Sequence, residues 1–327
     1  MIKAFVFGKF LPFHKGHEAM IHFALSKCDV LTVLVCCSDK ENIAAIVRKS
    51  WLEKAFENQP NIEIRTFNYL ESELPNTSES SKTVSEIWAT IFKQQFPDYS
   101  LLITSEEYGN FVADFMNIQH LAFDLPRKQF PVSATAVQHN LFANWNYLPD
   151  SVKPYFAIKV VVLGTESTGK TTLVEKLSTH FDCNLVTEAG RALIENSNSF
   201  TVEDLELVAK EHSKNIEQSI LGNSPLIIID TDIHITKSYA QFTLKKELEI
   251  SATVYHSNKA NLYLYLNNDV EYVQDGTRLS EVERNLLDLS HRQILEKHKI
   301  DIVEITGNWH QRVEKAVEEI NKIIVTI

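Results

Sequence analysis

The sequence has few cysteines and no long hydrophobic run, and each absence excludes a class of protein. Its four cysteines have none of the spacings of a metal site, so we expect Cys28, Cys36, Cys37 and Cys183 to be core residues in a reducing compartment, the cytoplasm. No apolar run approaches the ~20 residues of a membrane-spanning helix. The N-terminus lacks the basic and apolar regions of a signal peptide, so we expect neither a membrane nor a secreted protein.

Positive charge is also scarce, and in both halves of the chain. Lys and Arg number 32 against 43 Asp and Glu, a net charge of −11. Residues 1–150 carry 13 basic and 17 acidic side chains, and residues 151–327 carry 19 and 26. A nucleic-acid-binding protein usually has a basic half or stripe, because neutralising phosphates supplies much of its affinity. We therefore expect no nucleic acid partner, and phosphate-bearing ligands must be held locally by loops and a few cations.

The length and composition indicate two globular domains. A chain of 327 residues is long for one domain, and 44% hydrophobic and 23% charged residues are close to the globular average. Two prolines, Pro149 and Pro154, lie in a polar stretch at residues 146–154, which favours a boundary there. We expect domains at 1–150 and 151–327.

Both halves alternate short apolar runs with helical patterns, which predicts α/β domains with parallel sheets covered by helices. In the first half the expected strands are 2–7, 30–37, 62–67, 101–104 and 118–123, and the expected helices are 17–26, 43–57, 84–96 and 108–116. In the second half the expected strands are 158–163, 184–187, 226–229, 262–266 and 302–305, and the chain closes with an amphipathic helix at about 311–324.

The second half begins with a phosphate-loop motif. Residues 164–171, Gly-Thr-Glu-Ser-Thr-Gly-Lys-Thr, match GxxxxGK[ST] between the strand 158–163 and the helix 172–180. The glycines allow backbone N–H groups to surround a phosphate, Lys170 can reach the β- and γ-phosphates of ATP, and the Thr171 hydroxyl can ligate Mg²⁺. The alternative is a plain glycine turn. The expected ligands of ATP here are Gly164, Glu166, Ser167, Thr168, Gly169, Lys170, Thr171 and Thr172.

Acidic residues follow two other strands of this half. Asp230 and Asp232 end the apolar strand 226–229, where a carboxylate can hold Mg²⁺ or take a proton from an attacking hydroxyl. Either could instead cap the next helix, and the sequence does not separate the two. Glu188 and Arg191 follow the strand 184–187 and are candidate substrate ligands, unless they form only a surface ion pair.

The first half begins with a loop that contains two histidines. Residues 8–17, Gly-Lys-Phe-Leu-Pro-Phe-His-Lys-Gly-His, follow the first strand and open a helix. His14 and His17 are three residues apart, so both rings can face one side of the helix. Gly16 allows a phosphate to approach the backbone. The alternative is that both histidines only pack.

This loop resembles the signature GxFxPxHxGH of the HxGH nucleotidyltransferases. Those enzymes join a phosphate or a related nucleophile to the α-phosphate of a nucleoside triphosphate and expel pyrophosphate. A phosphate nucleophile is already deprotonated at pH 7, so positioning and charge stabilisation carry the catalysis. The resemblance implies that His14 and His17 are catalytic and that Gly8, Lys9, Phe10 and Gly16 bind the triphosphate.

A second element of that family has the form SxTxxR, and its arginine grips the triphosphate. Residues 133–138, Ser-Ala-Thr-Ala-Val-Gln, are similar to it. Ser133 and Thr135 match, whereas Gln138 stands where the arginine is expected.

An HxGH domain followed by a phosphate-loop kinase resembles the bifunctional NadR-type family along the whole chain. That family joins nicotinamide mononucleotide (NMN) adenylyltransferase to ribosylnicotinamide kinase. The resemblance implies a Rossmann-like domain before a P-loop kinase domain, with nicotinamide riboside, NMN, ATP and NAD as small-molecule partners and Mg²⁺ as cofactor. It places Arg48, Trp51, Tyr108 and Arg127 near the first substrate, and Asp275 and Arg278 near the riboside and lid of the kinase.

Some relatives carry an N-terminal helix-turn-helix that represses transcription. Because the first expected strand begins at Ile2, we expect no such module. Two other interpretations stay open, a kinase whose first domain is impaired or retargeted, and a non-catalytic nucleotide-sensing regulator. The sequence also leaves open whether the chain forms a homo-oligomer.

Overall fold

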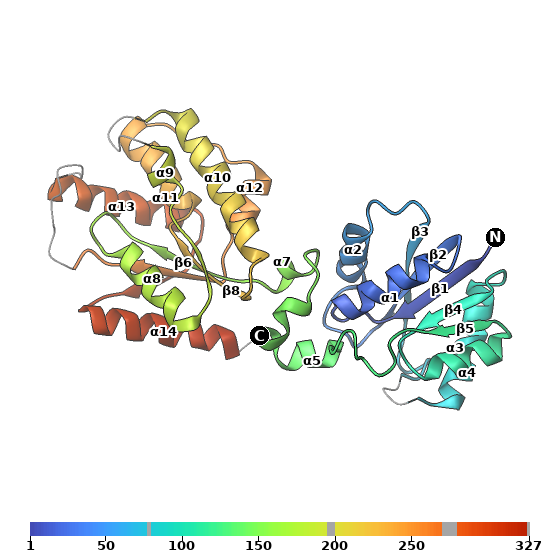
Figure 1. The fold of residues 1–327 in the computed structure, drawn as a ribbon. Helices are drawn as coiled ribbons and strands as arrows, with labels where there is room; N and C mark the ends of the chain where they lie inside the picture. The colour runs from blue at the N-terminus through green and yellow to red at the C-terminus, as the bar shows by residue number, and fades with distance from the viewer. Residues whose placement is uncertain (77–79, 195–199, 270–279, 326–327) are drawn as a thin grey trace. The chain divides into compact units, whose positions relative to one another are not determined.

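The computed structural model describes residues 1–76, 80–194, 200–269 and 280–325. The chain folds into two compact units, Met1–Lys153 and Pro154–Ile327, each built on a five-stranded parallel sheet (Figure 1). The α/β class with parallel sheets that the alternation predicts is therefore confirmed. Among the residues described, no helix has the length and apolar character needed to cross a membrane.

In the first unit, helices alternate with strands up to β5. The elements are β1 (Lys3–Gly8), α1 (Lys15–Leu25), β2 (Val30–Ser38), α2 (Ala45–Ala55), β3 (Ile62–Tyr69), α3 (Lys82–Gln95), β4 (Leu101–Thr104), α4 (Tyr108–Met116), β5 (Gln119–Ala122), α5 (Ala134–His139), α6 (Leu141–Asn144), η1 (Trp145–Tyr147) and α7 (Lys153–Phe156), the last crossing the boundary between the units. The strand order is β3-β2-β1-β4-β5.

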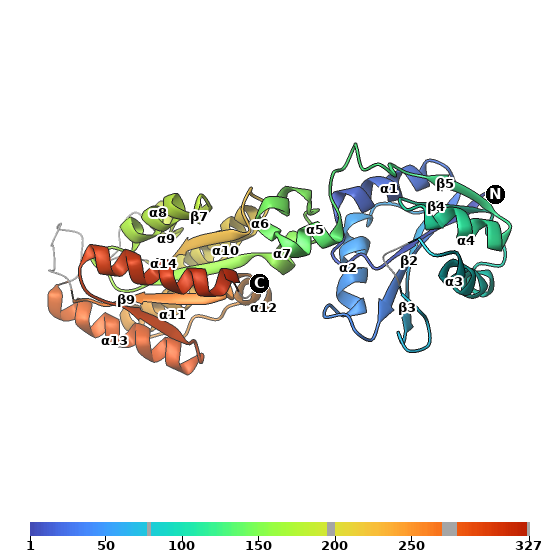
Figure 2. The same ribbon diagram turned by 90° about the horizontal axis from the view of Figure 1, so that it is seen from below.

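Apolar side chains on both faces of this sheet explain why helices cover both. Neighbouring residues of β1 point to opposite faces, and Ala4, Phe5 and Val6 are all fully buried. Phe5 faces α3 and α4, where its ring stacks on Phe96 with centroids 4.4 Å apart. Helices α1 and α2 contact β1, β2 and β3 from the other side (Figure 2).

The second unit repeats this plan with a different strand order, β10-β9-β6-β8-β7. Its elements are β6 (Ile158–Leu163), α8 (Lys170–Phe181), β7 (Asn184–Val186), α9 (Gly190–Leu193), α10 (Val202–Ile220), β8 (Leu226–Asp230), α11 (Ile233–Tyr239), η2 (Ala240–Leu244), α12 (Ala252–Asn258), β9 (Leu262–Leu266), α13 (Glu281–Lys297), β10 (Ile302–Ile305) and α14 (Trp309–Val325). Helices α8 and α14 pack together on one face of the sheet (Figure 1).

In both sheets the first strand lies in the middle, and the chain adds two strands on one side of it before adding two on the other side. β1 lies between β2 and β4, and β6 lies between β8 and β9. At such a reversal the loops at the carboxyl ends of the strands diverge and leave a crevice, which is where open α/β sheets bind ligands. The histidine loop follows β1 and the phosphate loop follows β6, so each motif lies at such a crevice.

Candidate functional site

The histidine loop ends with His14 as the N-cap of α1. Its Nδ1 accepts a hydrogen bond from the backbone N–H of His17, 3.4 Å away. The two imidazole rings stack with centroids 3.7 Å apart. Because Nδ1 of His14 is the acceptor, the proton of the neutral ring is assigned to Nε2, which is then a donor.

Both histidines are neutral at physiological pH. Burial lowers the pKa of His14 to about 4, and the nearby Arg127 guanidinium adds to the effect. Burial, the His14 ring and Arg127 lower the pKa of His17 well below its usual value. The Nδ1 of His17 is buried and has no hydrogen-bond partner among the described residues. The pair can therefore donate hydrogen bonds to an anion without carrying a charge.

Gly16 leaves room for the ring of His14. A Cβ atom at this position would lie 3.1 Å from both Cε1 and Nδ1 of the imidazole. Most real Cβ contacts are longer, so any other residue would push the ring away. In this chain the absence of a side chain at Gly16 allows the His14 ring to keep its position.

Two adjoining cavities meet at His17. The central cavity, of about 340 Å³, is lined by Phe7, Gly8, Lys9, Phe10, Leu11, His17, Met20, Thr104, Ser105, Glu106, Tyr108, Ala134, Thr135 and Gln138. The Arg127 cavity, of about 210 Å³, is lined by His14, Gly16, His17, Ser105, Glu106, Phe123, Asp124, Arg127, Phe130, Val132, Ser133, Ala134 and Thr135. The structure thus brings the histidine loop, the Ser133 motif, Tyr108 and Arg127 together around one histidine pair.

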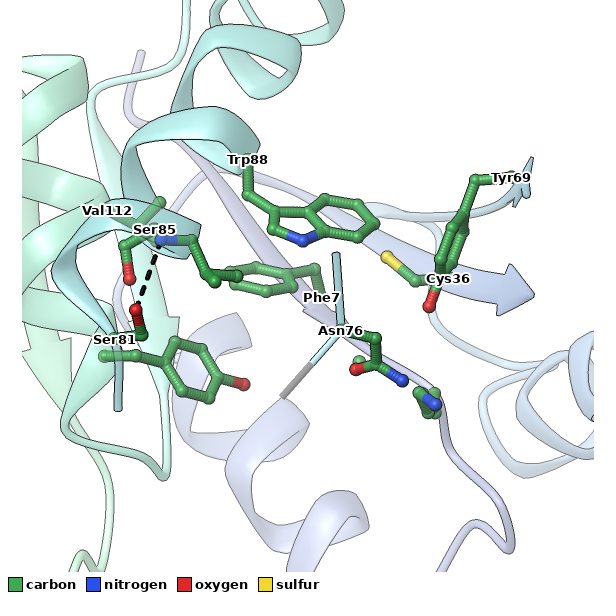
Figure 3. A pocket seen from close by; sticks show the side chains of 12 residues that line it. Phe7, Cys36, Tyr69, Asn76, Ser81, Ser85, Trp88 and Val112 are labelled. Carbon is green, nitrogen blue, oxygen red and sulfur yellow. Dashed lines mark hydrogen bonds between the residues drawn. The ribbon is translucent and has the colours of Figure 1, made fainter. Parts of the chain in front are cut away.

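A third cavity, the aromatic cavity, adjoins the central one on its other side and measures about 260 Å³ (Figure 3). Its walls include Phe7, Tyr69, Trp88 and Tyr108. The rings of Tyr69 and Trp88 are perpendicular, with centroids 5.1 Å apart. The indole Nε1–H donates to the carbonyl of Pro75, which fixes the ring against the cavity. Lys9 lines both this cavity and the central one.

Arg48 and Trp51 line none of these three cavities. Trp51 is buried in α2. Arg48 is fully buried, where it pairs with Glu41 at 2.7 Å and donates to the backbone carbonyl of Lys9 at 2.9 Å. Arg48 therefore supports the histidine loop from behind. Trp88 is the tryptophan at the cavity, and the sequence hid it because its spacing from Phe92 on α3 looks like an ordinary core stripe.

Gln138 contacts the histidine loop itself. Its Nε2 donates to the backbone carbonyl of Leu11 at a distance of 2.7 Å. The side chain also lines the central cavity, whereas Arg127 lines the adjoining cavity, and His17 lines both. Position 138 thus connects α5 to the loop that contains Phe10, whose backbone is left-handed with φ 48°.

The phosphate loop of the second unit has the backbone that its glycines predict. Gly164 and Gly169 have positive φ angles of 142° and 86°, and Ser167 between them has φ 58°. Lys170 begins α8 and its Nζ donates to the carbonyl of Thr165 at 2.9 Å. Thr168 is buried and its hydroxyl donates to the same carbonyl, so it holds the loop together from within.

Asp230 and Asp232 have different surroundings. Asp230 accepts a 2.9 Å hydrogen bond from Thr171 through Oδ2, and its buried Oδ1 has no partner among the described residues. Burial raises its pKa, while the nearby Lys170 ammonium acts in the opposite sense. Asp232 caps α11 by accepting from the backbone N–H groups of His234 and Ile235, and its second oxygen bonds the His234 ring.

One cavity of about 740 Å³ gathers most of the predicted kinase residues. It is lined by Glu166, Ser167, Gly169, Lys170, Thr171, Thr172, Glu188, Ala189, Gly190, Arg191, Ile194, Phe200, Leu205, Val208, His212, Thr231, Ile235, Thr236 and Tyr239. Arg191 pairs with Glu188 at 3.0 Å and lies 3.9 Å from Asp230. Asp275 and Arg278 lie outside the described residues.

The lining residues that were not foreseen from the sequence include His212 and Tyr239, which both make hydrogen bonds at the cavity. His212 of α10 bonds the backbone carbonyl of Thr231 through Nε2, and Tyr239 of α11 donates to Glu166 of the phosphate loop at 3.2 Å. Both lie on helices far along the chain from the motif, and nothing in their spacing distinguishes them from core residues. Among the described residues, no group of three or more His, Cys, Asp or Glu side chains is arranged to hold a metal by itself.

Comparisons with known proteins find relatives of part and of nearly all of the chain. The family model described as an AAA domain matches residues 159–312. The chain is 26% identical over 344 aligned residues to the trifunctional NAD biosynthesis/regulator protein NadR of Escherichia coli (strain K12), and 25% identical to that of Salmonella typhimurium (strain LT2). Each alignment covers 98% of this chain and 82% of the relative.

Two solved structures share the fold along nearly the whole chain. One is a NadR protein in complex with NAD and AMP-PNP, with a TM-score of 0.63 and 20% identity. The other is a NadR protein in complex with NR, with a TM-score of 0.65 and 19% identity. Both comparisons cover 98% of this chain and 95% of the other.

Proposed function

We propose that this chain, a homologue of the NadR proteins over nearly its full length, is a bifunctional enzyme of NAD salvage. The second unit phosphorylates nicotinamide riboside with ATP, and the first transfers an adenylyl group from ATP to the resulting NMN to give NAD and pyrophosphate. The observation that carries the proposal is that each unit has a phosphate-binding loop at the crevice of its own parallel sheet. Beside each loop lies a cavity that can hold a flat ring.

In the kinase step the 5′-hydroxyl of the riboside attacks the γ-phosphorus of ATP, and its proton must be removed. Of the two aspartates, Asp230 is the candidate proton acceptor, because it contacts Thr171 of the phosphate loop, whereas both oxygens of Asp232 are bonded within α11. Lys170 and Arg191 offset negative charge on the transferred phosphoryl group.

Thr171 and Asp230 also fit a magnesium ion. The hydroxyl of Thr171 and the unpartnered Oδ1 of Asp230 are hard oxygen donors, and Mg²⁺ is usually held by one or two such groups together with the phosphates of the nucleotide. When bound there, Mg²⁺ would neutralise negative charge on the phosphates of ATP. This division of ligands agrees with the finding that the described side chains form no metal cage of their own.

In the adenylyl-transfer step the phosphate of NMN attacks the α-phosphorus of ATP, and pyrophosphate leaves. The nucleophile is already an anion, so no general base is required. Neutral His14 and His17 donate hydrogen bonds to the oxygens on which charge develops, from a buried site where such bonds are strong. Lys9 lies between this site and the aromatic cavity, where it can hold the phosphate of NMN.

The aromatic cavity suits the nicotinamide ring. In NMN this ring is a flat pyridinium cation, and the faces of Trp and Tyr attract such cations as well as stack on them. Trp88, Tyr69 and Phe7 supply these faces within one cavity that opens toward Lys9 and the central cavity. The enzyme acts in the cytoplasm in this proposal, which the four free thiols and the use of ATP support.

The test is to supply nicotinamide riboside and Mg·ATP to the purified chain and follow products over time. NMN should accumulate first and NAD second. Lys170→Ala should stop consumption of the riboside but leave NAD formation from added NMN. His17→Asn should stop NAD formation from added NMN but leave phosphorylation of the riboside. Unchanged riboside consumption in Lys170→Ala would contradict the kinase assignment.

The neutral side chain at position 138 favours a second candidate, a working kinase whose first unit is impaired or retargeted. Supplying NMN and ATP directly separates the two, because only an active first unit releases pyrophosphate. Tight ATP binding without either turnover would instead support a nucleotide-sensing regulator.

A further inference from the structure

We propose that Arg127 supplies the positive charge that holds the triphosphate of ATP in the first unit, and that Gln138 braces the histidine loop in place of gripping phosphate. The inference rests on the adenylyl-transfer site proposed above. It divides between two residues the work that a single arginine at position 138 would do, and it follows from where the two side chains lie.

Arg127 belongs to the same cavity as both histidines. Its cavity is lined by His14, His17 and Ser133 as well as by its own side chain. A permanent cation and two neutral donors thus line one cavity, and the charge of Arg127 contributes to the lowered pKa values of both imidazoles. Arginine in this setting can bind two phosphate oxygens at once through its planar donor fork.

The backbone around Arg127 is held in an unusual shape. Arg127 and Asp124 both have left-handed backbones, with φ 50° and 42°, which non-glycine residues rarely adopt. The carboxylate of Asp124 stabilises the turn by accepting from the backbone N–H groups of Lys128, Gln129 and Phe130 at 2.9, 3.0 and 3.1 Å. Strained backbone that is fixed in this way concentrates at ligand-binding positions.

Arg127 is paired with Glu106, and this pair can open. The two groups are 2.6 Å apart, and each is a little under half exposed. Exposed ion pairs of this kind contribute little to stability. A triphosphate carries several negative charges against one on Glu106, so it can take over the guanidinium. Glu106 lines both the Arg127 cavity and the central cavity, where its charge opposes the binding of ATP.

The side-chain amide of Gln138 is hydrogen-bonded to the histidine loop. Its amide donates to the carbonyl of Leu11 at 2.7 Å, across 127 residues of sequence, and so fastens α5 to the loop before His14. The Gln138 side chain is neutral and lines the central cavity but not the Arg127 cavity. The cation that position 138 lacks is thus supplied, in this proposal, by Arg127 in the adjoining cavity.

The experiment measures ATP binding to the first unit by calorimetry in a Lys170→Ala background, which removes binding at the phosphate loop of the second unit. Adding Arg127→Gln should raise the Kd for ATP about 10- to 100-fold, the effect expected from losing a charge-assisted hydrogen bond. Arg65→Gln is the matched control, because Arg65 forms an equally short and exposed pair with Glu63 away from the cavities. It should leave the Kd unchanged.

Two further variants separate charge from structure. Arg127→Gln combined with Gln138→Arg should recover part of the lost affinity, because a cation is again within reach of the same cavities. Glu106→Gln should tighten ATP binding several-fold at low salt, an effect that general damage to the fold cannot produce. Unchanged ATP affinity in Arg127→Gln would overturn the inference.

These measurements also keep the inference apart from the proposed function. Release of pyrophosphate from NMN and ATP by the wild-type chain tests adenylyl transfer, whereas calorimetry tests only where ATP is held. A chain without turnover whose ATP binding still depends on Arg127 would contradict the function and support the inference. A chain that releases pyrophosphate, but whose Kd for ATP does not change in Arg127→Gln, would support the function and contradict the inference.

Discussion

The hydroxyl of Thr171 donates a 2.9 Å hydrogen bond to Oδ2 of Asp230, and this contact joins the phosphate loop to the end of β8. Asp232 is only two residues further on and faces away, toward the ring of His234. The residue between them, Thr231, has a left-handed backbone with φ 71°, which turns the chain so that the two carboxylates point to different surroundings. Of the two carboxylates, only that of Asp230 therefore contacts the phosphate loop.

We expect Asp230→Asn to lower activity and Asp232→Asn to lower stability. Asp230→Asn removes the proton acceptor and should lower kcat for riboside phosphorylation by about 10² to 10⁴, with little loss of stability. Asp232→Asn keeps a helix cap but weakens the bond to His234, so it should cost about 1–2 kcal/mol of unfolding free energy and leave kcat nearly unchanged. Steady-state kinetics and urea denaturation of both variants check this. A normal kcat in Asp230→Asn would contradict the assignment.

The aromatic cavity predicts a difference between two tryptophans. Trp88→Leu should raise KM for NMN about 10-fold, because it removes the face that attracts the pyridinium ring, and should leave KM for ATP unchanged. Trp88→Phe should lie closer to wild type, because it keeps an aromatic face. Trp51→Phe is the comparison, since Trp51 is buried outside the three cavities and should affect stability alone. A larger effect on KM for NMN from Trp51 than from Trp88 would reverse the assignment.

The low pKa of His14 predicts a loss of stability in mild acid. Its value of about 4 in the folded state lies below the ordinary 6.5, so the unfolded chain takes up this proton first as pH falls. Above pH 6.5 His14 is neutral in both states and does not change the unfolding free energy. At pH 5 it is protonated only in the unfolded chain, which should lower the unfolding free energy of the first unit by about 2 kcal/mol. His14→Gln keeps the cap acceptor and cannot titrate, so between pH 7 and 5 it should lose less stability than wild type by that amount. Denaturation at both pH values measures the difference, and parallel losses would contradict it.

Gly16→Ala should separate activity from stability. A methyl group would lie 3.1 Å from the His14 ring and displace it, so we expect adenylyl transfer to fall at least about 10-fold, in line with loss of one hydrogen bond to developing charge. Alanine also favours the helix, so the unit should stay folded. Riboside phosphorylation by the same protein serves as the internal control and should not change. Full adenylyl transfer in this variant would show that the ring position is not critical.

The sequence by itself determined the two α/β units and, after the first strand of each, the histidine loop and the phosphate loop. Buried parallel strands are short continuous apolar runs, and a loop that must curl around a phosphate requires glycine and lysine at fixed spacings, so both signals are local. The strands at 101–104, 158–163, 262–266 and 302–305 are observed with the expected bounds. The helix expected from residue 172 begins at Lys170, because the last turn of the phosphate loop is already helical.

Only the tertiary structure decided which side chains meet at each loop. Trp88 and Trp51 have the same side chain, yet packing directs Trp88 toward the aromatic cavity and buries Trp51 in the core. Arg127 comes next to His14 because Asp124 fixes a left-handed turn, and Gln138 reaches Leu11 because α5 returns to the first loop. These contacts join residues far apart in the chain through backbone turns and packing that no local pattern encodes, so the charge missing from one motif is found in a different segment.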